Sequence, residues 1–171
     1  MEGLPIRLAR RGDIPSLLLL WTAMMREFAE LDPRFEPHPK AREHMAATFA
    51  SWLQDPERIV VVAEEGGRMV VGFAAGVVVP GNGWQIPERL GRISDLYVAG
   101  PRRRQGIARR LVGRILDLLY EKGVDTVRLA AAVHNESAVG FWRSMGWIEL
   151  EAVLERSIEG LAPAQRPSAD V

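Results

Sequence analysis

The sequence predicts an α/β fold, with one domain in which helices cover a mixed β-sheet. Segments with helical periodicity alternate with short β-branched runs in the order β, α, α, β, β, β, α, β, α, β, which is typical of layered α/β domains. The 171 residues, 47% of them hydrophobic and 26% charged, suit one globular domain with a substantial core. Glycine and proline pairs mark the turns between the segments.

The first half of the chain is predicted to form a strand, two helices and a hairpin. Asp13 can cap the first helix, and we interpret the apolar stripe of that helix as core. Three prolines then interrupt the helical periodicity, and a Glu-Gly-Gly-Arg turn joins two β-branched runs into an antiparallel hairpin. The predicted elements are a strand at 6–9, a helix after Asp13, a loop at 30–39, a helix ending before Asp55, and strands at 58–64 and 69–79.

The second half is organised around residues 92–111. Residues 93–98 form a short run of apolar, β-branched and aromatic side chains that predicts a strand, closed by a Gly-Pro turn. From Ile107 apolar residues recur at helical spacing and charged residues hold the opposite face, which predicts an amphipathic helix. The other predicted elements are a loop at 80–91, a strand at 126–133, a helix opened by 135–137, a strand at 147–155 and a flexible tail at 161–171, which leaves 1–160 as the domain.

The junction between the central strand and helix predicts an anion-binding cradle. Arg102, Arg103 and Arg104 place positive charge beside the unpaired N–H groups of the first helical turn. Gly106 lets the backbone approach a ligand, and the small Ala108 keeps the next N–H accessible. A diphosphate would fit there. The glycine spacing matches neither the P-loop nor the dinucleotide-binding fingerprint.

Two motifs resemble those of the GNAT superfamily of acyl-CoA-dependent N-acetyltransferases. Arg103, Gly106 and Ala108 match its phosphate-binding motif, (Q/R)-x-x-G-x-(G/A). A helix and a strand separate this motif from a second one, N-x-x-A-x-x-F-(Y/W)-x-x-x-G-(F/W), as the family requires, and the resemblance extends over the chain to Glu155. The second motif is matched by Asn135, Ala138, Phe141, Trp142, Gly146 and Trp147.

The resemblance implies the GNAT fold and direct transfer of an acetyl group from acetyl-CoA to an amine, either on a small molecule or at a protein N-terminus or lysine. The strand ending at Val98 would splay from the strand at 126–133 and leave backbone groups free to pair with the pantetheine arm. The Val98 N–H would polarise the thioester carbonyl, and Asn135 would hold the pantetheine. The implied cofactor-binding residues are Leu96, Tyr97, Val98, Arg103, Arg104, Gln105, Gly106, Ile107, Ala108, Asn135 and Trp142.

Proton transfer has few candidates. Asp95 is the catalytic candidate, able to deprotonate or orient the amine, and its alternative role is a structural acceptor for a nearby loop. His134 has a suitable intrinsic pKa, but we interpret it as a surface-loop residue. Trp142 stands where many GNAT members have a tyrosine that protonates the thiolate, and its indole cannot do so. We therefore expect Trp142 to pack beside the pantetheine, Tyr97 to point away from the thioester, and Tyr120 to lie in the core.

Composition excludes several other classes of protein. The chain has no cysteine, and its three histidines are scattered with no carboxylate at ligand spacing, so we expect no disulfide framework and no metal site. Basic and acidic residues number 22 each, so nothing global indicates a nucleic-acid partner. Without an 18-residue apolar run or a signal peptide, we expect a cytoplasmic protein with no membrane partner. A homodimer stays open.

Two alternatives to an acetyltransferase also stay open. The first is an acyl-CoA-binding module that senses or regulates without turnover, suggested by the incomplete set of proton-transfer residues. The second is a phosphopeptide- or nucleotide-binding domain that uses only the arginine-glycine cradle. The amine acceptor is open among aminoglycosides, polyamines, amino acids and proteins, and carboxylates in the loops at 30–39 and 80–91 could attract a cation.

Overall fold

The computed structural model of the chain describes residues 3–84 and 87–157. Its helices and strands follow the predicted order up to the last helix. Three short 3-10 turns, η1 (Arg11–Asp13), η2 (Pro33–Phe35) and η3 (Gly100–Arg102), lie between them. The other elements are β1 (Ile6–Leu8), α1 (Ile14–Leu31), α2 (Ala41–Trp52), β2 (Arg58–Glu65), β3 (Met69–Pro80), β4 (Arg89–Val98), α3 (Ile107–Glu121), β5 (Val127–Leu129) and α4 (Glu136–Ser144).

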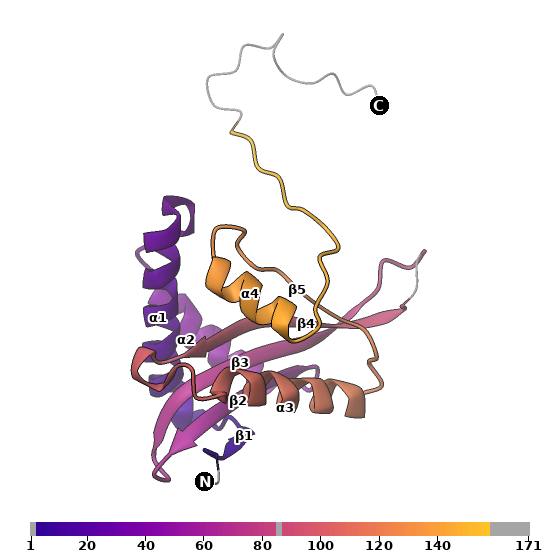
Figure 1. Ribbon diagram of the computed structural model, residues 1–171. Helices are drawn as coiled ribbons and strands as arrows, with labels where there is room; N and C mark the ends of the chain where they lie inside the picture. The colour runs from indigo at the N-terminus through magenta and orange to yellow at the C-terminus, as the bar shows by residue number, and fades with distance from the viewer. Residues whose placement is uncertain (1–2, 85–86, 158–171) are drawn as a thin grey trace.

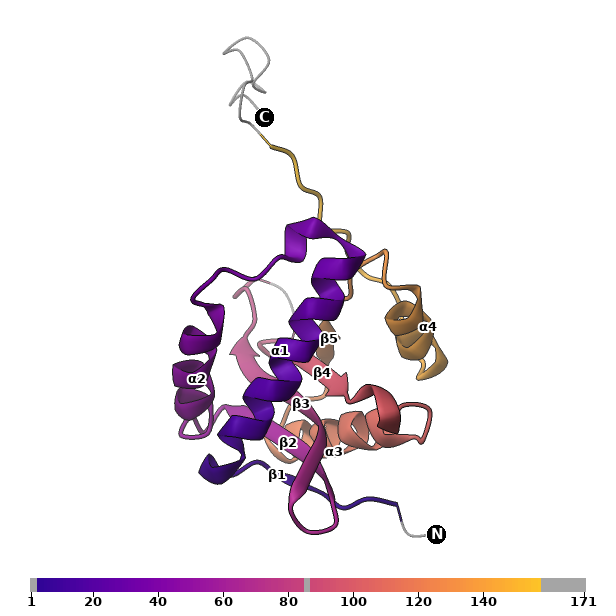
Figure 2. The ribbon, with the colours of Figure 1, turned by 90° about the vertical axis from the view of Figure 1, so that its left-hand side faces the viewer.

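The five strands form one mixed sheet in the order β1-β2-β3-β4-β5. The first four strands pair antiparallel, whereas β5 runs parallel to β4, and α3 supplies the crossover that parallel strands need. Helices α1 and α2 cover one face of the sheet and α3 covers the other, with α4 beside the edge formed by β4 and β5 (Figure 1, Figure 2). The predicted α/β class and the mixed, helix-flanked sheet are therefore confirmed.

Each face of the sheet carries its own apolar core. The amphipathic helix α3 buries Ile107, Leu111 and Ile115 on one face, each at most 3% exposed. On the other face Phe49 of α2 meets Phe73 of β3 edge to face, with ring centroids 6.0 Å apart. Strands β2 and β3 contribute to both cores, so their continuous β-branched sequences reflect burial on both faces, as predicted.

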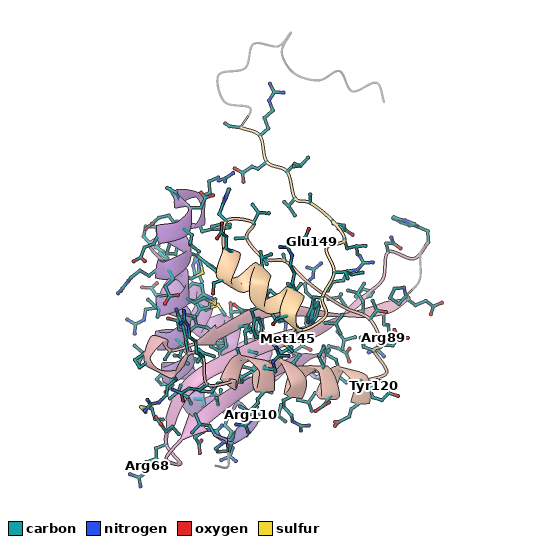
Figure 3. All side chains as sticks on the ribbon, in the orientation of Figure 1. Arg68, Arg89, Arg110, Tyr120, Met145 and Glu149 are labelled. Carbon is teal, nitrogen blue, oxygen red and sulfur yellow. The ribbon has the colours of Figure 1, made fainter. Side chains whose placement is uncertain are left out.

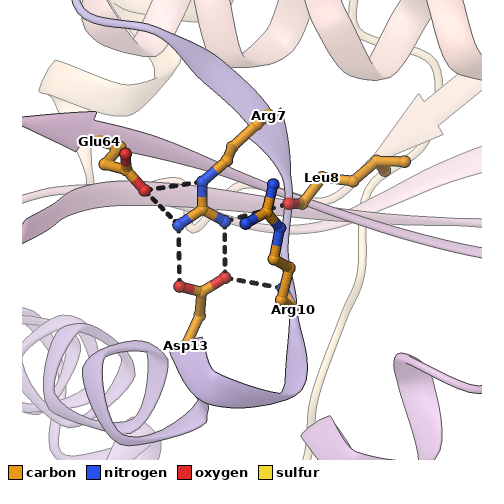
Figure 4. A network of polar contacts seen from close by, with 5 residues as sticks. All are labelled: Arg7, Leu8, Arg10, Asp13 and Glu64. Atoms are coloured by element: carbon orange, nitrogen blue, oxygen red, sulfur yellow. Dashed lines mark hydrogen bonds and ion pairs between the residues drawn. The ribbon is translucent and has the colours of Figure 1, made fainter. Parts of the chain in front are cut away.

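Arg7 of β1 ties the sheet to the start of α1 (Figure 4). Its guanidinium donates to both carboxylate oxygens of Asp13, at 2.7 and 3.0 Å, and to the carboxylate of Glu64 on β2. Asp13 directly precedes α1, as predicted for a cap, but its carboxylate accepts from Arg7 and from the Arg10 N–H instead of from a helix N–H. The Arg7 guanidinium holds the pKa of the Asp13 carboxyl below its usual value.

Strands β4 and β5 separate soon after they meet. Residues 91–93 of β4 pair with 127–129 of β5, and β4 then continues to Val98 with no strand on that side among the described residues. The edge of β4 from Ser94 to Val98 that faces away from β3 is consequently open. This is the splayed strand pair that the GNAT resemblance implied.

Helix α1 runs two residues into the predicted loop at 30–39, and three larger differences concern the second half of the chain. Strand β4 begins at Arg89, because the hairpin pairing with β3 extends to Pro80, so the predicted loop at 80–91 is too long. Strand β5 covers three residues of the predicted 126–133. The strand predicted at 147–155 is absent, because β5 is only three residues long and offers little ladder to pair with. That segment instead makes two exposed ion pairs, between Arg143 and Glu149 and between Arg128 and Glu151.

Two further expectations concern Tyr120 and the tail. Tyr120 is 75% exposed and lies on the surface of α3 (Figure 3), so its predicted core position is wrong. Leu119, one residue earlier, fills that core because the helix turns about 100° per residue. The predicted flexible tail at 161–171 lies outside the described residues.

A further finding concerns membrane spans. Among the helices that are described, none has the length and apolar character to cross a membrane.

Candidate functional site

A run of unpaired backbone N–H groups follows β4, at the position where the sequence predicts an anion-binding cradle. Arg104 and Gly106 both adopt left-handed backbone conformations, with φ of +61° and +75°. The first helical hydrogen bond of α3 runs from the Arg110 N–H to the Gly106 carbonyl. Within the part of the chain that is described, the N–H groups of residues 104–109 therefore have no protein acceptor. Consecutive N–H groups around left-handed residues form an anion-binding concavity, strengthened here by the α3 dipole.

Two of the three cradle arginines are committed to ion pairs. Arg102 donates to Glu65 at 2.9 and 3.1 Å. Arg103 donates through Nη2 to the Glu27 carboxylate of α1 at 2.6 and 2.8 Å. Among described residues, Arg104 forms no ion pair, so it is the guanidinium with the most freedom to meet a ligand. Much of the positive charge that the sequence placed here is therefore neutralised by Glu65 and Glu27.

Arg103 also connects the cradle to the end of β4. Its Nε donates to the Val98 carbonyl at 2.9 Å, and its guanidinium lies 5.1 Å from the centre of the Tyr97 ring. The Tyr97 hydroxyl donates to Glu27 at 2.7 Å. Burial and the neighbouring Glu27 carboxylate raise the pKa of Tyr97 to about 12, so its hydroxyl stays protonated near neutral pH. No sequence pattern marked Glu27, because its role depends on how α1 crosses β4.

The open edge of β4 presents the backbone groups that the resemblance implied. The Ala99 N–H donates to the Val71 carbonyl of β3 at 2.9 Å. Because successive N–H groups along a strand point to opposite edges, the N–H groups of Val98 and Leu96 point to the side that β5 has left. The Val98 carbonyl on that side is already taken by Arg103. Leu96 and Val98 face the α3 core whereas Tyr97 faces α1, as expected.

A β-bulge places Asp95 on the face covered by α1 and α2. Ile93 pairs with Gly76 and Asp95 with Ala75, so Ser94 is the extra residue. A bulge re-aims the side chains that follow it. Burial raises the pKa of the Asp95 carboxyl, and this exceeds the opposing effects of the Ser94 hydroxyl and the Arg58 charge. Sequence reasoning missed Arg58, which lies two strands away on β2.

The second motif supplies a helix cap and a packed aromatic group. The Asn135 side-chain oxygen accepts from the Ala138 N–H at 3.0 Å and so caps α4, which leaves its amide NH₂ for another partner. Trp142 is 9% exposed and packs edge to face against Phe141 and Trp147, with centroids 5.0 and 5.3 Å away. This packing agrees with a structural role for the Trp142 ring.

The structure gathers the predicted site residues along one path beside β4. His134 stands apart on the exposed loop before α4. Within residues 3–84 and 87–157, no three His, Asp or Glu side chains gather as a metal site would need. The path runs from Asp95, Leu96, Tyr97 and Val98 on β4, through Arg103, Arg104 and Gln105, to Gly106, Ile107 and Ala108 at the start of α3, with Asn135 and Trp142 at the two ends of α4.

Solved structures of other proteins share this fold. The BH1408 protein of Bacillus halodurans, solved as a tetramutant, is 20% identical with a TM-score of 0.81 over 91% of this chain and 100% of that one. The aminoglycoside antibiotic 6'-N-acetyltransferase AAC(6')-IG of Acinetobacter haemolyticus is 17% identical with a TM-score of 0.70, over 91% and 99%. The aminoglycoside acetyltransferase meta-AAC0020, from an uncultured soil metagenomic sample, is 25% identical with a TM-score of 0.66, over 91% and 95%.

Structural similarity below 25% sequence identity shows the fold alone. The family is shown by a match to the sequence. No curated protein matches the chain. The sequence profile of the acetyltransferase (GNAT) family matches residues 21–147, which include the cradle, the open edge of β4 and all of α4. The chain therefore belongs to the GNAT acetyltransferase family.

Proposed function

We propose that this protein transfers an acetyl group from acetyl-CoA directly to a primary amine, on a small molecule or at a protein N-terminus or lysine. One observation carries the proposal. Unpaired backbone N–H groups lie in two sets, at Leu96 and Val98 on the open edge of β4 and at residues 104–109, and the partly buried Asp95 adjoins the first set. Donors in that order suit a ligand with amides and a carbonyl at one end and a diphosphate at the other.

Each group has a defined task in such a transfer. The N–H groups of residues 104–109 would hold the diphosphate, assisted by Arg104. The Leu96 and Val98 N–H groups would bind the pantetheine and the thioester carbonyl, where a donor can stabilise the oxyanion that forms. The Asn135 NH₂ would add a contact from α4. Asp95 would take the proton that the amine releases, directly or through water.

The departing thiolate has no acid on this path. Trp142 is packed and its indole does not usefully ionise. Tyr97 lies on the opposite face of β4 from Leu96 and Val98, and its hydroxyl is bound to Glu27. Thiolate departure would therefore be assisted by water or need no acid.

The experiment that tests the function combines acetyl-CoA with a panel of amines and measures the release of free thiol. The panel should contain amino acids, polyamines, an aminoglycoside and a lysine peptide. We expect amine-dependent thiol release and an acetylated product. If no amine causes thiol release, calorimetry with acetyl-CoA distinguishes two explanations. Tight binding without turnover would support the acyl-CoA-binding module, whereas no binding would contradict both functions.

Replacing Gly106 with alanine should weaken CoA binding about tenfold or more. A Cβ at Gly106 meets no protein atom within 4 Å, so it would project into the open cradle. Because φ is +75°, the change also strains the backbone, at a cost of about 1 kcal/mol. Gly123 is a matched control, since it has the same φ and equally open surroundings at the far end of α3.

Both variants should lose similar stability in urea denaturation, whereas calorimetry should show weaker CoA binding for Gly106→Ala alone. Equal CoA affinities in the two folded variants would remove the cradle from the proposed site.

A further inference from the structure

Two arginines lie side by side at the start of the β4–β5 pairing. Arg92 of β4 and Arg128 of β5 are direct partners in the parallel register. Partners of this kind share a face of the sheet, and neighbouring strands are about 4.8 Å apart. Both side chains are exposed. Like charges directly opposite each other on a sheet are destabilising, so a negative charge near the two arginines would stabilise the pair.

The protein supplies little of that counter-charge. Arg128 reaches the Glu151 carboxylate at 3.4 Å, but that carboxylate is 73% exposed, and such surface pairs contribute about 1 kcal/mol or less. The Arg92 side chain has neither an ion pair nor a hydrogen bond to any group of the described residues. The two guanidinium groups therefore present several free N–H donors to the solvent.

Both arginines line one hollow of about 240 Å³. Its apolar lining includes Val79 and Leu90, on the part of the β3–β4 hairpin that extends beyond α1 and α2 (Figure 1). An apolar wall with two guanidinium groups suits a ligand that has a short aliphatic portion and an anionic end.

The hollow lies on the same face as Asp95. On β3, Ala75 is the partner of Asp95 and Val77 is the partner of Arg92, and residues two apart on a strand share a face. The separation along the strand is about 10 Å or less, at roughly 3.3 Å per residue. Val77 is also the partner of Arg58, so a third arginine stands in the same row across the sheet.

The cofactor's own phosphates do not account for this pair of arginines. The cradle follows Val98, at the other end of β4, which is about 20 Å from Arg92 along the strand. A ligand whose diphosphate occupies the cradle would keep those charges far from Arg92 and Arg128. A ligand of these two arginines would therefore be another molecule, and Asp95, the proposed base, lies on the same face.

We propose that Arg92 and Arg128 bind an anionic group, a carboxylate or a phosphate, carried by the amine acceptor. This inference rests on the proposed acetyl transfer and names its substrate class. Guanidinium forks match the planar carboxylate and the phosphate oxygens, and Asp95 lies within reach of the amine at the other end of a short acceptor. Polycations such as polyamines and aminoglycosides are disfavoured by the arginine row. The loop carboxylate of Asp32 does not offset it, because Arg34 already binds that group.

The test compares amine acceptors of equal length that differ only in the group at the end opposite the amine. Glycine, 4-aminobutanoate and 6-aminohexanoate are each paired with the amino alcohol and the diamine of the same length, and 3-aminopropylphosphonate distinguishes a phosphate-like group from a carboxylate. Thiol release with saturating acetyl-CoA gives kcat/KM for each. We expect the anionic members of at least one length to exceed the alcohol and the diamine by about tenfold or more, with an advantage that shrinks in high salt.

Variants assign that preference to the arginine pair. Arg92→Gln and Arg128→Gln should each lower kcat/KM for the anionic acceptor by about 10- to 100-fold, the effect of one lost charge-assisted contact, and leave the KM for acetyl-CoA unchanged. Arg68→Gln is the control, because Arg68 is an exposed arginine in the β2–β3 turn, far from Arg89 and the start of β4 (Figure 3). It should change neither parameter.

A binding measurement separates this inference from the proposed function. Calorimetry titrates 4-aminobutanoate, 6-aminohexanoate and 3-aminopropylphosphonate into the wild type and Arg92→Gln, each with CoA present. Binding that Arg92→Gln abolishes supports the anion site even if no amine is acetylated, in which case only the transfer proposal fails. Equal kcat/KM for anionic, neutral and cationic acceptors, or no binding of any anionic probe, overturns the anion site whether or not thiol is released.

Discussion

Replacing Asp95 with asparagine is expected to lower kcat by about 10²- to 10⁴-fold and leave the dissociation constant of CoA unchanged. The reason is the position of this carboxylate, which the bulge at Ser94 places on the α1–α2 face beside the open edge of β4. Burial raises the pKa of Asp95, so the carboxylate is a stronger base than an exposed aspartate. Thiol release at saturating amine and acetyl-CoA measures kcat, and calorimetry measures the affinity for CoA.

The same variant separates a catalytic base from a structural acceptor through its stability. Since the pKa of Asp95 is raised above the ordinary 3.8, the stabilisation from its protonated form is present below that value and is lost as pH rises through the folded-state pKa. Asparagine carries no charge, so the melting temperature of Asp95→Asn relative to the wild type should increase between pH 4 and pH 7. A carboxylate needed as a structural acceptor would give the reverse, a variant that is less stable at pH 7.

Asp117→Asn is the control for the loss of a carboxylate, because Asp117 is exposed on the charged face of α3. It should keep wild-type kcat and CoA affinity. A decrease in kcat of less than about threefold in Asp95→Asn would remove Asp95 from proton transfer.

Local patterns were sufficient to predict most of the fold. Helix α3 could be predicted because one apolar stripe buries Ile107, Leu111 and Ile115 together, and the hairpin because two β-branched runs flank a short turn. The strand expected at 147–155 also has an alternating pattern, but a strand exists only where another edge can pair with it, and β5 ends at Leu129. Tyr120 shows the same limitation, because two adjacent apolar positions both fitted the stripe and packing selected Leu119.

The candidate site divides in the same way. The cradle and α4 could be located because their motifs are contiguous and their chemistry resides in the backbone around Gly106 and the cap at Asn135. Contacts between distant segments left no local signal. Glu27 neutralises Arg103 across 76 residues of sequence, and Arg92 meets Arg128 only because β5 joins the sheet in that register. The two contacts that would position the cofactor and select the charge of the acceptor could therefore not be predicted from the sequence.

Replacing Arg7 with methionine is expected to lower the free energy of unfolding by roughly 2–3 kcal/mol at pH 7. Methionine keeps the aliphatic stem and removes the five N–H donors, so Glu64 loses its cation and Asp13 keeps only the Arg10 N–H. The side chains of Asp13 and Glu64 are only 12% and 16% exposed. Breaking a buried ion pair by removing one partner costs about 3–5 kcal/mol. We expect less here because the Arg7 side chain is 23% exposed and water can reach part of the network (Figure 4).

The sign of the pH dependence identifies the cause of that loss. In the wild type Arg7 holds the pKa of Asp13 below its ordinary 3.8, so this stabilisation is present above about pH 4 and is lost as pH falls through the folded-state pKa. The difference in unfolding free energy between the wild type and Arg7→Met should therefore be constant from pH 7 to about pH 5 and shrink below pH 4, which urea denaturation can measure. Arg89→Met removes the exposed pair with Glu57, whose side chains are 51% and 46% exposed, and should cost less than about 1 kcal/mol. If the two variants lost equal stability, the Arg7 network would be no more than a surface ion pair.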